Sequence, residues 1–212
     1  MQGCSLSCSF CHNPDSQCFD GDREVTSDQL MKKIERFRPY FDRSGGGVTF
    51  SGGEPLLQKD FITEMFTRCK EKGIHTCLDT SGAVKGDFIS LLKYTDLVLY
   101  DVKAITKEGY RDICGGDISV TEAFQKQLEE TETKTIVRQV VVPGINDTEE
   151  YMLMLKSYIS TRLPHASSVE LLPYHLMGVH KYKKAGMAEP LLGVPAMNKN
   201  KVLQLQKKFF NQ

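Results

Sequence analysis

The chain has 212 residues, of which 40% are hydrophobic and 25% charged, proportions typical of a globular protein with one domain. Its 27 basic residues balance its 27 acidic ones, so neither nucleic acid nor an anionic membrane surface is expected as a partner. No apolar run approaches the roughly 20 residues that span a bilayer, and the N-terminal residues lack the pattern of a signal peptide, so we expect a cytoplasmic protein.

Three of the seven cysteines lie in a short polar segment near the N-terminus. Cys4, Cys8 and Cys11 have the spacing CxxxCxxC, which lets three thiolates bind one inorganic centre. Zinc and iron–sulfur clusters both take thiolates, but a closed site of either kind needs four protein ligands. The fourth ligand is His12, a distant cysteine, or absent, and its absence would leave one iron open to a small molecule.

The other four cysteines give no second cluster motif. An odd number of cysteines, crowded at one end, favours a metal site in a reducing cytosol over a disulfide framework. Cys69, Cys77 and Cys114 are interpreted as small buried apolar residues. Cys18 is an alternative ligand for the centre.

Hydrophobic spacing and turn residues predict strands that alternate with helices. A polar loop is expected over residues 14–25. The expected helices cover residues 26–39, 59–72, 88–92, 121–132, 148–162 and 199–210. The expected strands cover residues 48–50, 74–78, 97–100, 135–142 and 169–172.

This alternation predicts an α/β fold with a parallel sheet in a single domain, residues 1–212. Within it we expect a cluster loop (1–25), βα repeats (26–197) and a C-terminal helix (198–212). No strand is predicted before the cysteines, although a barrel of this kind would need one leading into that loop.

Polar residues gather where the predicted strands end. Glu54, Asp79, Asp101, Lys103 and His175 lie at or just past the carboxyl ends of strands. Because parallel α/β folds bind ligands at that edge, these residues predict an active site there. The alternative is that they are loop and cap residues.

These motifs resemble known ones. CxxxCxxC followed by His-Asn, with Ser51-Gly-Gly-Glu-Pro55 after the next strand, resembles the radical S-adenosylmethionine (SAM) superfamily. The wider pattern is similar to the pyruvate formate-lyase activating enzymes over nearly the whole chain. It is carried by residues 11–13 (CHN), 47–54 (GVTFSGGE), 75–82 (HTCLDTSG), 140–144 (VVVPG) and 170–175 (ELLPYH).

The distance in sequence between the cysteine motif and the SGGEP motif indicates which type of activase the chain resembles. Only residues 12–50 lie between Cys11 and Ser51, which leaves no room for the ferredoxin-like insertion that several activases of other glycyl radical enzymes carry. The alternatives are an activase of a different glycyl radical enzyme or of anaerobic ribonucleotide reductase, and an N-terminally truncated, inactive paralogue that binds an iron–sulfur centre or zinc. The family normally begins with a further strand and a glycine-rich loop, so the resemblance implies a partial (β/α)6-type radical SAM barrel that lacks its first strand.

The resemblance implies a radical SAM oxidoreductase. Cys4, Cys8 and Cys11 would hold three irons of a 4Fe-4S cluster, and the open iron would bind the amine and carboxylate of SAM. Reductive cleavage of SAM would give a 5′-deoxyadenosyl radical, which abstracts a Cα hydrogen from a glycine of pyruvate formate-lyase. The implied partners are that glycyl radical enzyme and a flavodoxin or ferredoxin as reductant. We expect a monomer that acts in anaerobic metabolism.

The resemblance also assigns roles to residues around the cluster. Phe10, Cys11 and His12 would meet the adenine, Gly52 and Gly53 would allow close approach of the methionine part, and His175 would reach the ribose or adenine. A plain turn is the alternative for the glycines, and a loop histidine for His175.

Charged residues complete the implied site. A monovalent cation, Na⁺ or K⁺, would be held by Asp79, Thr80, Asp101 and the carbonyl of Leu99. Val102 is assigned to the cofactor site with Lys103 and Arg138, which would supply positive charge to the SAM carboxylate. Arg138 pairing with a core carboxylate is the alternative. The basic cluster of Lys181, Lys183 and Lys184 would meet an acidic reductant, or is a solvated loop.

Overall fold

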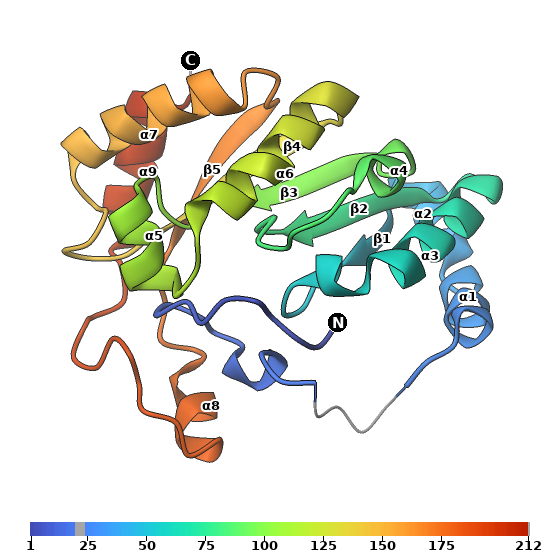
Figure 1. Ribbon diagram of the computed structural model, residues 1–212, viewed down its shortest axis with the longest axis horizontal. Helices are drawn as coiled ribbons and strands as arrows, with labels where there is room; N and C mark the ends of the chain where they lie inside the picture. Colours follow the sequence, from blue (N-terminus) through green and yellow to red (C-terminus); the bar gives the residue numbers. More distant parts are fainter. Residues whose placement is uncertain (20–23, 212) are drawn as a thin grey trace.

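The protein is described by a computed structural model that covers residues 1–19 and 24–211 (Figure 1). In these residues, five parallel strands form one sheet in the order β1-β2-β3-β4-β5. The strands are β1 (Gly47–Phe50), β2 (His75–Thr80), β3 (Leu97–Asp101), β4 (Thr135–Val141) and β5 (Ser168–Pro173). The predicted parallel α/β fold is confirmed, with β1 and β5 at the edges of the described sheet.

Helices connect the strands, and several of them form a layer on one face of the sheet (Figure 1). The helices are α1 (Ser27–Glu35), α2 (Arg38–Ser44), α3 (Lys59–Glu71), α4 (Ile89–Lys93), α5 (Lys107–Cys114), α6 (Ile118–Thr131), α7 (Glu149–Arg162), α8 (Val179–Lys184) and α9 (Lys199–Phe209), with 3-10 helices η1 (Pro14–Ser16) and η2 (Pro55–Gln58). Sequential strands joined by right-handed crossovers place their helices on the same face. Accordingly α3, α4, α6, α7 and α9 contact one another in that order.

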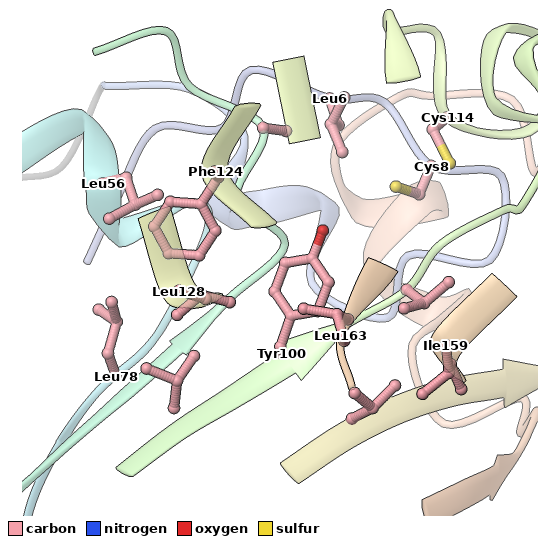
Figure 2. Packing of buried hydrophobic residues seen from close by; sticks show 14 of the residues in the cluster. Leu6, Cys8, Leu56, Leu78, Tyr100, Cys114, Phe124, Leu128, Ile159 and Leu163 are labelled. Atoms are coloured by element: carbon pink, nitrogen blue, oxygen red, sulfur yellow. The ribbon is translucent and has the colours of Figure 1, made fainter. Parts of the chain in front are cut away.

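The two faces of the sheet differ in their side chains. Val137 and Val141 of β4 are fully buried, and Tyr100, beside Val137 in register, accepts a hydrogen bond from Gln125 of α6 at 2.9 Å. Figure 2 shows Tyr100 in the core beneath the helices. Arg138, the residue after Val137 in β4, points to the opposite face, where it lines a cavity. Period-two alternation along each strand therefore separates the core from the site.

Residues 1–13 cross the carboxyl ends of the strands (Figure 1). Gly53 donates its N–H to the Met1 carbonyl at 3.0 Å, and Glu54 donates to the Gly3 carbonyl at 2.7 Å. These backbone hydrogen bonds hold the cysteine loop, defined here as residues 3–13, against the end of β1.

Several predicted boundaries were wrong. The helix expected over 26–39 is two helices, because α1 ends at Glu35 and Pro39 lies in the first turn of α2. Proline lacks the N–H that a helix interior needs but that the first turn leaves unbonded, so it begins a helix more readily than it continues one. The start of α1 was predicted correctly: Thr26 and Gln29 form a capping box.

Two helices were not predicted. The segment after β3 was expected to contain one helix over 121–132, but α5 precedes α6, and the Gly- and Lys-rich stretch after β5 contains α8. Both are short, and tertiary contacts stabilise helices of one or two turns more than their own sequence does. The strands β2 and β3 also extend further than predicted and include Asp79 and Asp101.

Residues 20–23 of the predicted loop and Gln212 of the predicted C-terminal helix lie outside the described residues. Within the described parts, no helix has both the length and the apolarity needed to cross a membrane.

Candidate functional site

A cavity of about 320 Å³ lies between the cysteine loop and the carboxyl ends of the strands. Most of the residues predicted for the site line it: Cys4, Cys8, Phe10, Cys11, His12, Gly52, Gly53, Asp79, Thr80, Asp101, Lys103 and Arg138. The fold therefore brings together side chains from the loop and from β2, β3 and β4 that lie far apart in the sequence.

The three thiols of the motif all belong to this wall. Burial raises the pKa of Cys4 to about 11, whereas a hydrogen bond from Cys114, helped by the positive charge of Lys103, lowers the pKa of Cys8. Buried thiols ionise only when positive charge or hydrogen bonds compensate the lost hydration. A bound metal supplies that charge, so Cys4 would become a thiolate by releasing its proton when a metal binds.

Among the alternatives for a fourth ligand, His12 lines the cavity and Cys18 is exposed outside it. The His12 side chain lines the cavity but is exposed, and its ring centroid lies 5.3 Å from that of His175. Partial burial and then the neighbouring His175 lower the pKa of His12, which disfavours its protonated form. In the described chain no three His, Cys, Asp or Glu side chains converge as a single-ion site requires; the thiolates of a four-iron cluster bind separate irons.

The cysteine loop is held from its C-terminal side by α8. The Tyr182 hydroxyl donates to the Cys11 carbonyl at 2.8 Å, and Lys181 donates to the Asn13 side chain at 2.6 Å and pairs with Asp15 at 3.1 Å. Gly178 precedes α8, and a Cβ there would lie 2.5 Å from the Cα of His12. Sequence reasoning missed these residues because only the tertiary fold brings them to the loop.

Gly52 and Gly53 have a packing role. A Cβ at Gly52 would overlap the Met1 backbone, and one at Gly53 would overlap the Gly3 and Ser16 carbonyls. Gly52 also has φ +138°, which disfavours other residues. The absence of side chains lets the loop approach β1; close approach of a ligand to the same glycines stays a prediction.

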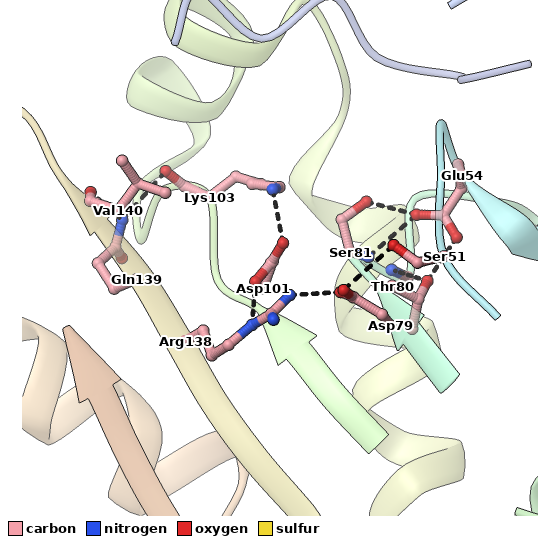
Figure 3. A network of polar contacts seen from close by, with 11 residues as sticks. Ser51, Glu54, Asp79, Thr80, Ser81, Asp101, Lys103, Arg138, Gln139 and Val140 are labelled. Atoms are coloured by element: carbon pink, nitrogen blue, oxygen red, sulfur yellow. Dashed lines mark hydrogen bonds and ion pairs between the residues drawn. The ribbon is translucent and has the colours of Figure 1, made fainter. Parts of the chain in front are cut away.

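Asp79, Asp101, Lys103 and Arg138 form one ionic network (Figure 3). Asp101 accepts from Arg138 Nε at 2.9 Å and from Lys103 Nζ at 2.9 Å, and Arg138 also pairs with Asp79. Burial would raise the pKa of Asp101, but Lys103 and Arg138 together lower it; the pKa of Asp79 is raised by burial and by the charge of Asp101. The cationic group between the two carboxylates is thus the Arg138 guanidinium, the pairing that the sequence left as the alternative for this residue.

The sequence placed Glu54 of the SGGEP motif among the strand-end residues of the predicted active site but gave it no individual role. Its carboxylate is buried at the cavity wall and accepts from Ser81 N at 3.0 Å, Ser81 Oγ at 2.7 Å and Leu56 N at 3.2 Å. The Thr80 hydroxyl also donates to Glu54. Burial raises the Glu54 pKa, and these donors offset part of that rise.

Three predicted residues lie outside the cavity wall. Val102 is buried in the core, and its N–H donates to the Arg138 carbonyl at 2.9 Å. Leu99 lies beside Asp79 in the register of β2 and β3. His175 packs against His12, and its Nδ1 accepts from the Met177 N–H at 3.4 Å. Their assigned roles, and the cation site that includes Leu99 and Thr80, stay predictions.

Comparison with known proteins bears directly on this site. A family model described as the Radical SAM superfamily matches residues 1–155. A pyruvate formate-lyase-activating enzyme from Clostridium pasteurianum is 45% identical over 98% of this chain and 87% of that protein. One from Staphylococcus aureus (strain USA300) is 41% identical over 92% of this chain and 80% of that protein.

The chain belongs to the radical SAM superfamily and, within it, to the pyruvate formate-lyase-activating enzyme family. Solved structures agree on the fold of this family member. A domain of a pyruvate-formate lyase-activating enzyme from Bacteroides vulgatus ATCC 8482 matches with TM-score 0.61 and 22% identity over 76% of this chain and 91% of that one. Streptococcus suis SuiB bound to S-adenosylmethionine matches with TM-score 0.66 and 15% identity over 98% and 44%.

Membership of the radical SAM superfamily implies a 4Fe-4S cluster and SAM, and this site fits both. Three thiols line one cavity, as a cluster with one iron free of protein ligands requires. The same wall carries Lys103 and Arg138 for a carboxylate and Phe10 for an apolar surface.

Proposed function

We propose that this chain activates pyruvate formate-lyase by forming a glycyl radical on it. The observation that carries the proposal is the cavity in which the three-thiol loop meets the charged carboxyl ends of β2, β3 and β4. The 45% identity to a relative named pyruvate formate-lyase-activating enzyme supports this substrate over other glycyl radical enzymes.

Cys4, Cys8 and Cys11 would hold the cluster, and the iron without a protein ligand would take SAM. When bound, these groups supply the one-electron cleavage of a sulfur–carbon bond and the 5′-deoxyadenosyl radical that removes the glycine hydrogen. The protein's own contribution is to bind and orient the cluster and SAM and to exclude competing reactions. His12, whose pKa is lowered chiefly by partial burial, would contact the adenine with Phe10 and Cys11.

Burial would lower the pKa of Lys103, but the charge of Asp101, the nearby Cys8 and the hydrogen bond to Asp101 together raise it, so Lys103 stays protonated at this site. Its Nζ lies 5.7 Å from the Phe10 ring centroid, a distance that permits a cation–π contact. Lys103 and Arg138 would therefore supply positive charge close to the SAM carboxylate. Val102, Gly52, Gly53 and His175 complete the proposed cofactor site.

A Na⁺ or K⁺ ion bound by Asp79, Thr80, Asp101 and the Leu99 carbonyl belongs to the same proposal. Such an ion would share the two carboxylates with Arg138.

We also propose a flavodoxin or ferredoxin as reductant, a monomeric state and a cytoplasmic location. Lys181 is engaged by the cysteine loop, so Lys183 and Lys184 are the members of the basic cluster that remain available for an acidic reductant.

The first test is anaerobic reconstitution with iron and sulfide, followed by electron paramagnetic resonance (EPR) spectroscopy of the reduced protein with and without SAM. We expect about four irons per chain and a spectrum that changes when SAM is added. Cys8→Ala should lose the cluster, whereas Cys18→Ala, an exposed thiol outside the cavity, is the matched control and should keep it. A spectrum that SAM leaves unchanged would contradict the open-iron site.

The second test mixes the reduced, SAM-loaded protein with pyruvate formate-lyase and measures the EPR doublet of a glycyl radical. A doublet with that enzyme supports the proposal. A doublet only with another glycyl radical enzyme would reassign the substrate, and none with any of them would indicate an inactive paralogue.

A further inference from the structure

A fourth buried thiol lies directly behind the cysteine loop. Cys114 is the last residue of α5 and is fully buried, and its thiol is the neighbour of the Cys8 thiol (Figure 2). Cys8 lines the cavity, whereas Cys114 lies outside the cavity wall. Cys114 is therefore placed to contact a cavity ligand only through Cys8.

The backbone fixes this arrangement on both sides of Cys8. Ser7 donates its N–H to the Cys114 carbonyl at 3.0 Å, and Ser9 donates to the Ile113 carbonyl at 2.8 Å. Gly115 ends α5 with φ +68°, and a Cβ there would lie 2.5 Å from Ser7 Oγ. The end of α5 is thus pressed against the loop, so the two thiols stay adjacent without depending on a flexible side chain.

The chemistry of the pair is asymmetric. As a cluster ligand Cys8 would be a thiolate without a proton, whereas Cys114, which lies outside the cavity wall, keeps its S–H. Cys114 is therefore the hydrogen-bond donor and Cys8 the acceptor. Hydrogen bonds to the sulfur ligands of an iron–sulfur cluster are among the factors that set its reduction potential.

We propose that Cys114 is a positioning residue for the cluster: its S–H donates a hydrogen bond to the Cys8 thiolate and thereby favours the reduced cluster. Reduction adds negative charge that is shared by the cluster and its thiolates. A donor fixed at one thiolate interacts more strongly with the reduced state than with the oxidised state, so it makes the uptake of the electron easier. The inference rests on the proposed function, since it requires Cys8 to be a cluster ligand.

The test compares three variants of the full chain after anaerobic reconstitution. Cys114→Ala removes the donor, and Cys114→Ser keeps a donor. Cys69→Ala is the matched control, because Cys69 is equally buried but lies on α3, away from the loop. Iron content is measured for each, and the potential is obtained from a redox titration followed by EPR.

We expect Cys114→Ala to make one-electron reduction about tenfold less favourable, a fall of about 59 mV for one electron. Cys114→Ser should keep the wild-type potential or exceed it, and Cys69→Ala should match the wild type. A role in packing alone would lower the stability of both alanine variants without moving the potential.

The outcomes separate the two proposals. If the wild type assembles no cluster, or its spectrum ignores SAM, the proposed function fails and this inference fails with it. If the wild type behaves as proposed but Cys114→Ala has the potential of Cys69→Ala, only the role of Cys114 is overturned. If Cys114→Ala takes up no iron, the Cys114→Ser variant provides the test. A reduction potential equal to or above that of the wild type supports the hydrogen-bond donor. One-electron reduction that is tenfold less favourable than in the wild type overturns it.

Discussion

Replacement of Arg138 by glutamine tests whether the guanidinium holds the two strand-end carboxylates together. Arg138 pairs with both Asp79 and Asp101, and Lys103 pairs only with Asp101. In Arg138→Gln, Lys103 would still compensate Asp101, but Asp79 would lose its cationic partner. We expect the folded protein to lose stability at neutral pH.

The size of the loss follows from burial. The side chains of Arg138, Asp79 and Asp101 are 17%, 21% and 19% exposed. Breaking a fully buried ion pair costs about 3–5 kcal/mol and an exposed one less than about 1 kcal/mol. With four-fifths of each group buried and Lys103 still present, we expect a loss of about 2–3 kcal/mol in the free energy of unfolding.

The contributions of Asp101 and Asp79 to stability change with pH in opposite directions. In the wild type the pKa of Asp101 is lowered, so its contribution to stability is present above the unfolded pKa and is lost as pH falls through the folded value. The raised pKa of Asp79 acts in the opposite direction: its contribution is present at low pH and is lost as pH rises through the folded value. Without Arg138 both pKa values rise. The penalty of Arg138→Gln should therefore be largest near neutral pH, shrink as the pH falls, and disappear only below the lowered pKa of Asp101, where both carboxyls are protonated in the wild type as well.

Urea unfolding of the cluster-free protein under reducing conditions measures this loss at several pH values. Arg138→Lys is the control, because it keeps the charge but lacks the fork that reaches both carboxylates, and it should lose about half as much. In the Arg138→Gln background, Asp79→Asn should restore about 1 kcal/mol by removing one of the two like charges. A loss below about 0.5 kcal/mol, or an equal loss at acid and neutral pH, would refute this account of the network.

Three further changes test the shell around the cavity. Ser81→Ala removes one donor to Glu54 and should lower the free energy of unfolding by about 1–2 kcal/mol in urea unfolding; an unchanged midpoint would contradict it. Tyr182→Phe removes a hydrogen bond that holds the cysteine loop and should speed the loss of iron to a chelator several-fold, whereas iron release at the wild-type rate would mean that α8 does not restrain the loop. Gly178→Ala places a methyl group against the His12 backbone and should weaken SAM binding, measured by equilibrium titration of the reconstituted protein; wild-type affinity would show that this contact can relax.

The local sequence was sufficient to predict the cysteine motif, the strands and the longer helices. Cys4, Cys8 and Cys11 lie within one short segment, so their spacing alone indicated a common centre. The strands and the longer helices have hydrophobic patterns that repeat over many residues. Since parallel strands end at one edge, the polar residues that follow them could be assigned to one site before their contacts were known.

The partners of those polar residues were decided by the tertiary structure. The sequence left Arg138 with two interpretations, and only the register of β2, β3 and β4 brings its guanidinium to both Asp79 and Asp101. Gly52 and Gly53 were assigned to a ligand, but the folded chain also uses their small size to pack the cysteine loop.

The same limit applies to α5 and α8, which are too short for a periodic signal and are stabilised by contacts with distant segments. Those contacts place Cys114 behind Cys8 and Tyr182 beside Cys11. Sequence spacing determined which residues can hold the cluster, because those residues are neighbours in the chain. The groups that surround them come from distant segments, and their positions depend on how the whole chain packs.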